Sequence, residues 1–150
     1  MEVICMIWVI NSNSNICRIY EYNQQEKKLP LIKEIKHPEN RLKTSEIISD
    51  KQGHYKSNSG YGSYTQTSDP KEVQIDHFYR EIAEELNQGR NNENYDQLII
   101  ISPPHLIGLL FQHLDKNVKK MILNNIQKDL LHLSDQELLD FVRTHYLPAT

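Results

Sequence analysis

A polar stretch in the first half of the chain holds most of the side chains that could do chemistry. Residues 49–72 read SDKQGHYKSNSGYGSYTQTSDPKE and contain no Leu, Ile, Val, Phe or Trp. The stretch mixes cations with aromatic rings, at Lys51, His54, Tyr55, Lys56, Tyr61 and Tyr64. Because rings stack on unpaired bases and cations bind phosphates, this composition predicts contact with single-stranded or ribosomal RNA. The competing interpretation is a tolerated surface linker.

The same stretch also supplies groups that a hydrolase or nuclease could use, namely His54, Tyr55, Ser59, Ser63 and Asp69. Ser102 and His105 form a second candidate, at the end of an apolar run where open α/β sheets commonly place ligands. Ser-Pro-Pro-His lacks the glycine-flanked elbow that exposes a catalytic serine. A strand end followed by a helix start, with a surface histidine, is therefore the favoured interpretation of Ser102 and His105.

The residue types and their spacing do not favour a metal-binding site. A two-metal nuclease needs several carboxylates clustered on a sheet, and the early strand-like segments offer only Glu2, Glu21 and Glu34. The seven histidines are dispersed, without HExxH or Cys/His ligand spacing. We therefore expect no metal and no cofactor, and we favour a protein that is not an enzyme.

Three further charged residues are candidates for binding. Arg41 precedes the polar stretch, where a guanidinium can brace a loop or grip phosphate. Lys128 and Asp129 lie late in the chain and could form a polar cluster with Asp50 or Arg41. A structural brace for Arg41 and an ordinary surface ion pair for Lys128 and Asp129 are the alternatives.

Hydrophobic periodicity predicts the elements that must position these residues. Strands are expected at 3–10, 16–22 and 31–36, the first two forming a hairpin around a turn at 11–14. Asp69, Pro70 and Glu72 have the spacing of a helix cap and capping box, and the helix they begin should end at Gly89. Residues 97–102 read as a strand buried on both faces, hence central.

The last third of the chain reads as mainly helical. Two short helices are expected after residue 103 and after Asp115, whereas 123–133 fits either a continued helix or an edge strand. Ser134 and Glu137 form a capping box that opens a final helix. This order of elements predicts one domain over residues 1–150, a three-layer mixed α/β sandwich with a flexible loop at about 49–70.

Composition indicates a soluble chain in a reducing compartment. The formal charge is −3 over 150 residues, although residues 26–60 carry more Lys and Arg than Asp and Glu. Two cysteines, Cys5 and Cys17, cannot form the disulfide framework of a small secreted domain. No apolar run approaches the length that spans a bilayer, and the N-terminal run lacks the flanks of a secretion signal. We expect a cytoplasmic protein without membrane insertion.

Several segments together resemble a known family. They are W-V-I-x-S-x-x-x-x-C-R-I-Y from Trp8, HPENRLKTSEIISDKQG, GYGSYTQTSDPKE, YDQLIIISPPHLIGLL and IQKDLLHL. The chain resembles the bacterial host attachment family over nearly its whole length. That family is similar in turn to the central domain of archaeal and eukaryotic peptide-release factors, which implies a ribonuclease-H-like mixed sheet flanked by helices.

The resemblance also gives the polar loop a role. In release factors the corresponding loop carries Gly-Gly-Gln, whereas here the sequence from Gly60 to Gln66 reads GYGSYTQ, so peptidyl-tRNA hydrolysis is not implied. We expect a non-catalytic protein that binds RNA or the ribosome through its 49–72 loop. The predicted contacts are Arg41, Asp50, Lys51, His54, Tyr55, Lys56, Gly60, Tyr61, Gly62, Tyr64 and Asp69. The alternatives are a protein-interaction factor that contributes indirectly to attachment to host cells, and a hydrolase or nuclease that uses the loop.

Overall fold

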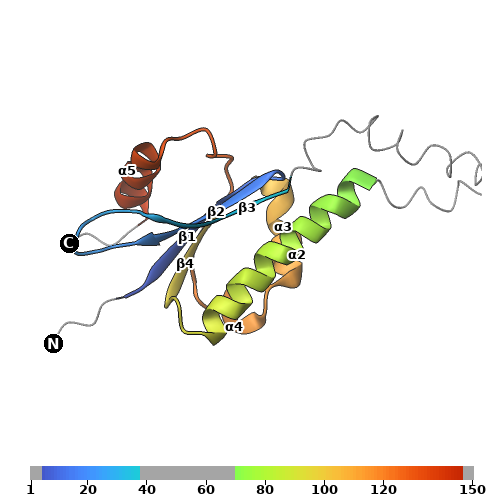
Figure 1. The fold of residues 1–150 in the computed structure, drawn as a ribbon, viewed down its shortest axis with the longest axis horizontal. Helices are drawn as coiled ribbons and strands as arrows, with labels where there is room; N and C mark the ends of the chain where they lie inside the picture. The colour runs from blue at the N-terminus through green and yellow to red at the C-terminus, as the bar shows by residue number, and fades with distance from the viewer. Residues whose placement is uncertain (1–4, 38–69, 147–150) are drawn as a thin grey trace, which may run out of the picture.

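The computed structural model describes residues 5–37 and 70–146, which form a mixed sheet with helices on both of its faces (Figure 1). The elements follow in the order β1 (Ile7–Ser12), β2 (Ile16–Tyr22), β3 (Leu31–Lys36), α2 (Pro70–Asn91), β4 (Gln97–Ile101), α3 (Pro104–His113), α4 (Lys116–Lys119), β5 (Ile122–Ile126) and α5 (Asp135–His145). The predicted mixed α/β fold is therefore confirmed.

The strands lie in the order β3-β2-β1-β4-β5. β2 pairs antiparallel with both β1 and β3, whereas β1, β4 and β5 run parallel. The strand β4 has the sequence QLIII, and its four apolar residues fit a strand that is covered on both faces. The sequence predicted an interior position for it, and β4 lies between β1 and β5. β5 forms one edge, which decides between the two predictions for 123–133 in favour of a strand at its start.

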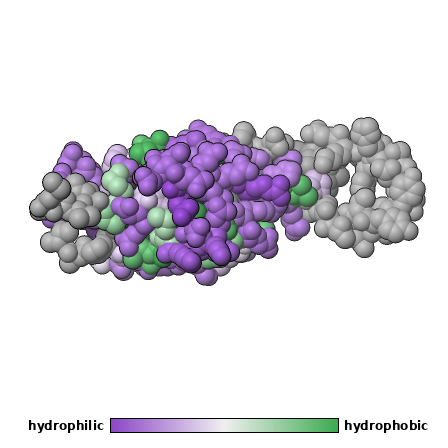
Figure 2. Space-filling view, turned by 90° about the horizontal axis from the view of Figure 1, so that it is seen from below, coloured by the Kyte–Doolittle hydropathy of each residue, from purple (hydrophilic) through white to green (hydrophobic). Residues whose placement is uncertain are grey.

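Successive side chains of a strand point to opposite faces of the sheet, and they pack into two separate hydrophobic cores, one on each face. Trp8 and Ile10 of β1 point towards the core under α2, α3 and α4. Ile7 and Val9 point the other way, into the core under α5. The side of the molecule seen in Figure 2 is largely hydrophilic, with only isolated hydrophobic residues.

α2 is longer than the sequence predicted. Gly89 was expected to end it, but the helix continues to Asn91. A Cβ on Gly89 would lie 2.9 Å from Cε2 of Tyr95 and 3.0 Å from two ring carbons of Trp8. The glycine is therefore explained by close packing of two rings on the helix and not by a helix stop. The expected cap at Asp69 lies outside the described residues.

The prediction for the end of the first strand was wrong by two residues, whereas the capping box predicted for the final helix is confirmed. β1 runs from Ile7 to Ser12, so two polar residues predicted in the turn, Asn11 and Ser12, instead end the strand. At α5 the capping box is present: the Ser134 hydroxyl accepts from the Glu137 N–H, and the Glu137 carboxylate accepts from the Ser134 N–H.

Candidate functional site at the carboxyl end of the sheet

The long polar segment is attached where the parallel strands β1 and β4 end. The chain leaves the described residues after His37, whose backbone N–H donates to the carbonyl of Asn15 in the β1–β2 turn at 2.9 Å. The His37 ring lies 5.0 Å from the ring of Phe78 on α2, between centroids. The chain returns at Pro70, the first residue of α2, so both attachment points face this end of the sheet (Figure 1). Open α/β sheets commonly bind ligands at this end.

The residues predicted to contact a partner through the loop lie outside the described residues. They are Arg41, Asp50, Lys51, His54, Tyr55, Lys56, Gly60, Tyr61, Gly62, Tyr64 and Asp69. Their role therefore stays a prediction, and the described side chains around the two attachment points define the candidate site.

Three buried hydroxyl groups join the ends of β1 and β4 to α2. The Tyr79 hydroxyl lies 3.2 Å from Oγ of Ser12 and 2.9 Å from Oγ of Ser102, and Ser12 donates to the carbonyl of Ile101 at 3.4 Å. With the Ser12 proton used in this way, Tyr79 donates to Ser12 and accepts from Ser102. The three residues are fully buried. The hydroxyl chain therefore fixes the strand ends to the helix.

Burial also sets the chemistry of Tyr79. It raises the pKa of the Tyr79 phenol to about 12, although the hydrogen bonds with Ser102 and Ser12 act in the opposite direction. The phenol stays protonated at neutral pH, so it can donate a hydrogen bond but cannot act as a base. In this arrangement the hydroxyl chain braces the strand ends against α2.

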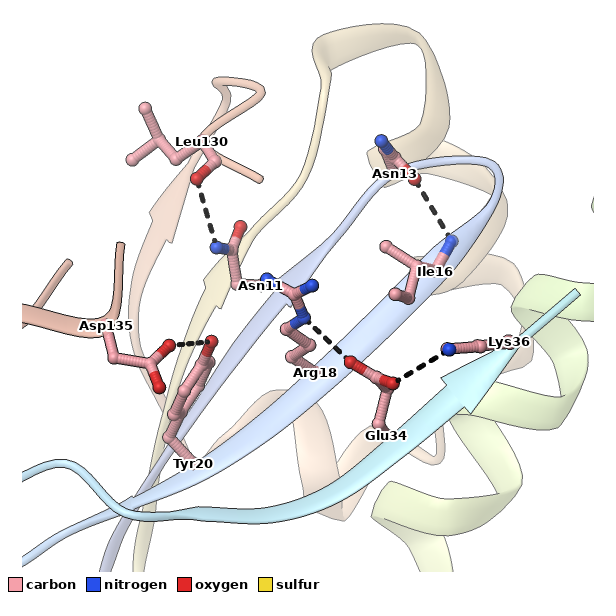
Figure 3. A network of polar contacts seen from close by, with 9 residues as sticks. All are labelled: Asn11, Asn13, Ile16, Arg18, Tyr20, Glu34, Lys36, Leu130 and Asp135. Carbon is pink, nitrogen blue, oxygen red and sulfur yellow. Dashed lines mark hydrogen bonds and ion pairs between the residues drawn. The ribbon is translucent and has the colours of Figure 1, made fainter. Parts of the chain in front are cut away.

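The opposite face of the same end carries a row of polar side chains (Figure 3). Asn11, Arg18 and Glu34 occupy neighbouring positions on β1, β2 and β3. Asn11 donates from Nδ2 to the carbonyl of Leu130 at 3.3 Å. Arg18 donates from Nε to Glu34 at 2.8 Å, and the Lys36 ammonium lies 3.6 Å from the same carboxylate. The hydrogen bond from Arg18 is the main cause that lowers the pKa of Glu34.

Tyr20 ties this row to the start of α5. Its hydroxyl donates to the carboxylate of Asp135 at 3.1 Å. Burial, followed by the nearby Asp135 charge, raises the pKa of Tyr20 to about 12. The carboxyl end is thus connected to helices on both faces, through Tyr79 to α2 and through Tyr20 to α5.

Most of the buried polar atoms that lack a hydrogen-bond partner gather at this end. Within the described residues they are Oδ1 of Asn11, Oδ1 of Asn15, Nδ1 of His37 and Oε1 of Gln74, together with Nε1 of Trp8 at the opposite end. A buried polar group without a partner costs about 1–3 kcal/mol. Such a group needs an explanation, such as bound water or a ligand. We therefore take the carboxyl end as the candidate site.

The remaining predicted residues are not brought together by the described structure. Ser102 is buried in the hydroxyl chain, whereas His105 is exposed on the first turn of α3. Lys128 lies with its Nζ 5.4 Å above the ring of Phe141. The Asp129 carboxylate accepts a local hydrogen bond from the N–H of Leu131 at 3.3 Å. The predicted cluster of Lys128 and Asp129 with Asp50 or Arg41 involves residues outside the described ones.

Sequence reasoning missed the residues that build the described site. The sequence predicts a turn over Asn11 and Ser12 and gives no functional role to Tyr79. One signal was available: Asn11, Ser12 and Ser102 are polar residues directly after apolar runs, at strand ends that a parallel sheet brings together. The hydroxyl of Tyr79 carries no comparable signal, because a buried tyrosine at helical spacing looks like core.

A hollow of about 570 Å³ at the other end of the sheet is a weaker candidate. Its lining consists of Arg90, Asn91, Glu93, Tyr95, Asp96 and Met121. The Asp96 carboxylate accepts from the Met6 N–H at 2.8 Å, and the Tyr95 hydroxyl donates to the Leu86 carbonyl at 2.5 Å. Two of its polar groups therefore serve to hold the chain segments together.

Two kinds of feature are absent from residues 5–37 and 70–146. No group of three or more His, Cys, Asp or Glu side chains is placed to hold a metal ion there. No helix in those ranges is long and apolar enough to cross a membrane.

The fold and the site together define a mixed α/β protein whose candidate site lies at the carboxyl ends of its parallel strands. The chain belongs to the family described as "Protein required for attachment to host cells", whose profile matches residues 8–142. No curated protein matches the chain.

Two solved structures match the chain at low sequence identity. An archaeal translation termination factor, aRF1, is 16% identical with a TM-score of 0.50, and the match covers 93% of this chain and 38% of that one. The type II variant of the Aquifex aeolicus Ppx/GppA phosphatase is 12% identical with a TM-score of 0.37, over 82% of this chain and 35% of that one. The chain spans less than two-fifths of the length of either protein. At these identities the likeness to aRF1 concerns the fold alone.

Proposed function

We propose that this protein is a non-catalytic cytoplasmic binding module that contacts RNA or the ribosome through residues 49–72. The observation that supports the proposal is where the chain leaves and re-enters the described residues. It leaves after β3 and returns at the start of α2, both at the end of the sheet where four buried polar atoms lack partners within the described residues. The lysines, tyrosines and histidine of residues 49–72 are of the types that bind phosphates and stack on bases.

The likeness to the archaeal termination factor supports the proposal at the level of fold. It extends over 93% of the chain. The strand order β3-β2-β1-β4-β5, with β2 alone antiparallel to its neighbours, is the basis for describing the sheet as ribonuclease-H-like. The sequence GYGSYTQ stands where the resemblance would place Gly-Gly-Gln, so the proposal is binding without hydrolysis.

Sedimentation of native lysate through a gradient at low and at high salt tests the proposal. We expect the protein to migrate with ribosomes at low salt and to move to the top fractions at high salt, because counterion release drives binding to phosphates. Replacing Lys51 and Lys56 with Gln and Tyr61 and Tyr64 with Leu should abolish co-migration.

The matched control replaces two exposed lysines far from the segment, Lys119→Gln and Lys120→Gln, and should leave co-migration unchanged. Wild-type protein that stays in the top fractions at both salt concentrations would refute ribosome association. If the purified protein also binds no RNA, the proposed RNA-binding function is refuted.

The family description favours a second candidate, a protein-interaction factor with an indirect contribution to attachment to host cells. It predicts a protein partner whose capture does not require RNA. Pull-down with tagged protein before and after ribonuclease treatment separates the two candidates. A partner retained after the treatment supports the second, whereas loss of all bound material supports the first.

A further inference from the structure

Three aromatic rings gather at the end of α5, on the face of the sheet opposite α2. Phe141, His145 and Tyr146 form a ring cluster with centroid separations of 4.7 Å for Phe141–His145, 5.6 Å for Phe141–Tyr146 and 5.8 Å for His145–Tyr146. Phe141 and Tyr146 pack against the core on their inner side and remain partly open to solvent, and His145 is exposed. The packing beneath holds the rings in place before any partner arrives.

A cation accompanies the ring cluster. Nζ of Lys128 lies 5.4 Å from the centroid of Phe141, over its ring. Among the residues that the structure describes, Lys128 has no carboxylate within ion-pair distance. Its charge is therefore open to an anionic partner.

Three carboxylates of α5 make hydrogen bonds within the fold. Asp135 accepts from Tyr20, Glu137 takes part in the capping box of α5, and Asp140 accepts from Gln136 at 3.0 Å. Within residues 5–37 and 70–146, none of these three acids forms an ion pair with Lys128.

We propose that the ring cluster and Lys128 form a second contact surface for single-stranded RNA, with a base stacked on Tyr146 or His145 and a phosphate near Lys128. Lys128 already lies over Phe141, so the other two rings are the more accessible ones. Partly open rings held next to an unpaired cation are the elements of a single-strand binding surface. This inference rests on the proposed RNA-binding function and adds a surface on the α5 face that the 49–72 segment does not include.

The test measures fluorescence anisotropy of two labelled probes with the full chain. One probe is a short oligouridylate, and the other is an abasic ribose-phosphate oligomer of the same length. Tyr146→Leu keeps apolar packing but removes the ring, so it should weaken oligouridylate binding about tenfold and leave abasic binding unchanged. Phe111→Leu, at a half-buried phenylalanine of α3 on the other face, is the matched control and should change neither.

A second variant tests the cation. Lys128→Gln should weaken both probes and reduce the slope of log affinity against log salt by about 0.7, the value for one contact to a single-stranded phosphate. The control Lys119→Gln should leave the slope unchanged. Thermal melting followed by circular dichroism verifies that each variant is folded.

The outcomes separate this inference from the proposed function. Oligouridylate binding that survives Tyr146→Leu but is lost in the variant of the 49–72 segment would overturn the ring cluster as a contact and leave the proposed function standing. Equal weakening of both probes by Tyr146→Leu, or equal weakening by Phe111→Leu, would also overturn it. Wild-type protein that binds neither probe would overturn the RNA-binding function and this inference together.

Discussion

At the amino end of β1 and β4, aromatic rings pack directly on the backbone. The rings of Trp8 and Tyr95 lie 4.9 Å apart between centroids, and Gly89 contacts both. At the carboxyl end, Tyr79 holds the strands through hydroxyl groups instead. Within the described residues, one buried polar atom without a partner, Nε1 of Trp8, lies at the amino end, whereas four lie at the carboxyl end. The difference shows that both ends are held by side-chain contacts, and that buried polar atoms without partners are concentrated at the carboxyl end.

High pH should produce the largest loss of stability, because it acts on phenols at both ends. Tyr79 and Tyr95 have pKa values raised to about 12, mainly by burial, against about 10 in an unfolded chain. The folded state therefore binds more protons between pH 10 and 12, so stability is fully present below pH 10 and falls as pH rises towards 12. For Tyr79 alone the loss approaches about 2 kcal/mol. Urea unfolding at a series of pH values measures it.

The control for the pH series is the phenolate absorbance of the folded protein. Part of the tyrosine signal should titrate near pH 12, at Tyr20, Tyr79 and Tyr95. If all eight tyrosines titrate together near pH 10 while the protein is still folded, the assigned burial is wrong.

Tyr79→Phe tests the carboxyl end alone. The change removes one hydroxyl and leaves Ser12 and Ser102 buried with one hydrogen bond fewer each, which should reduce the free energy of unfolding by about 1–3 kcal/mol. Urea denaturation of both proteins gives the difference. Tyr22→Phe is the control, since within the described residues its hydroxyl has no hydrogen-bond partner. A loss for Tyr79→Phe no greater than for Tyr22→Phe would show that the hydroxyl chain does not stabilise the fold.

Gly89→Ala tests the amino end. Alanine favours a helix over glycine by up to about 1 kcal/mol, but here its methyl group would meet the buried rings of Tyr95 and Trp8 at 2.9 and 3.0 Å. Overpacking costs about 1–3 kcal/mol, so the net effect should be a loss of up to about 2 kcal/mol. Gly108 on α3 has no atom within 4 Å of an added Cβ, so Gly108→Ala should instead stabilise by about 0.5–1 kcal/mol. Equal thermal shifts for the two variants would contradict the ring packing.

Ser134→Ala should have the smallest effect, because it removes one cap at a solvent-exposed helix start. The Ser134 hydroxyl accepts from the Glu137 N–H at 3.1 Å, and its loss should cost about 1 kcal/mol. Chemical denaturation compares the free energy of unfolding of Ser134→Ala with that of Ser134→Thr. Threonine retains a capping oxygen, so Ser134→Thr should be destabilised less. If alanine and threonine behave alike, the capping box does not contribute to the stability of α5.

The regular elements could be predicted from the sequence because their signals are local. Alternation placed the second and third strands, and Ser134 with Glu137 placed the start of α5. The interior place of β4 followed from its unbroken apolar run. The bounds of β1 and α2 were less accurate, because Asn11 and Gly89 usually mark turns and helix ends. Here tertiary packing uses one as a strand end and the other as a close contact.

The candidate site was much harder to predict. Ser102 was singled out from the sequence, but as a strand end and not as a partner of Tyr79. For Lys128 the sequence left open a polar cluster with Asp50 or Arg41 and an ordinary surface ion pair, and neither alternative pointed to the ring of Phe141, thirteen positions later in the chain. The contacts of Tyr79 with Ser102 and of Lys128 with Phe141 follow no regular spacing along the chain, so the sequence carried no signal for them.

The sequence by itself determined the order of the elements as far as α4, the start of α5, the two-sided burial of the central strand and the position of the long polar segment in the chain, but it left 123–133 open between a helix and a strand. Propensity, periodicity and capping depend on neighbouring residues, so they can be read along the chain. Only the tertiary structure decided which residues meet at the carboxyl end. Ser12, Tyr79 and Ser102 are brought together by the parallel pairing of β1 with β4 and by the packing of α2 on both. Contacts of that kind depend on strand register and helix packing, which are set by the whole core and not by any one segment.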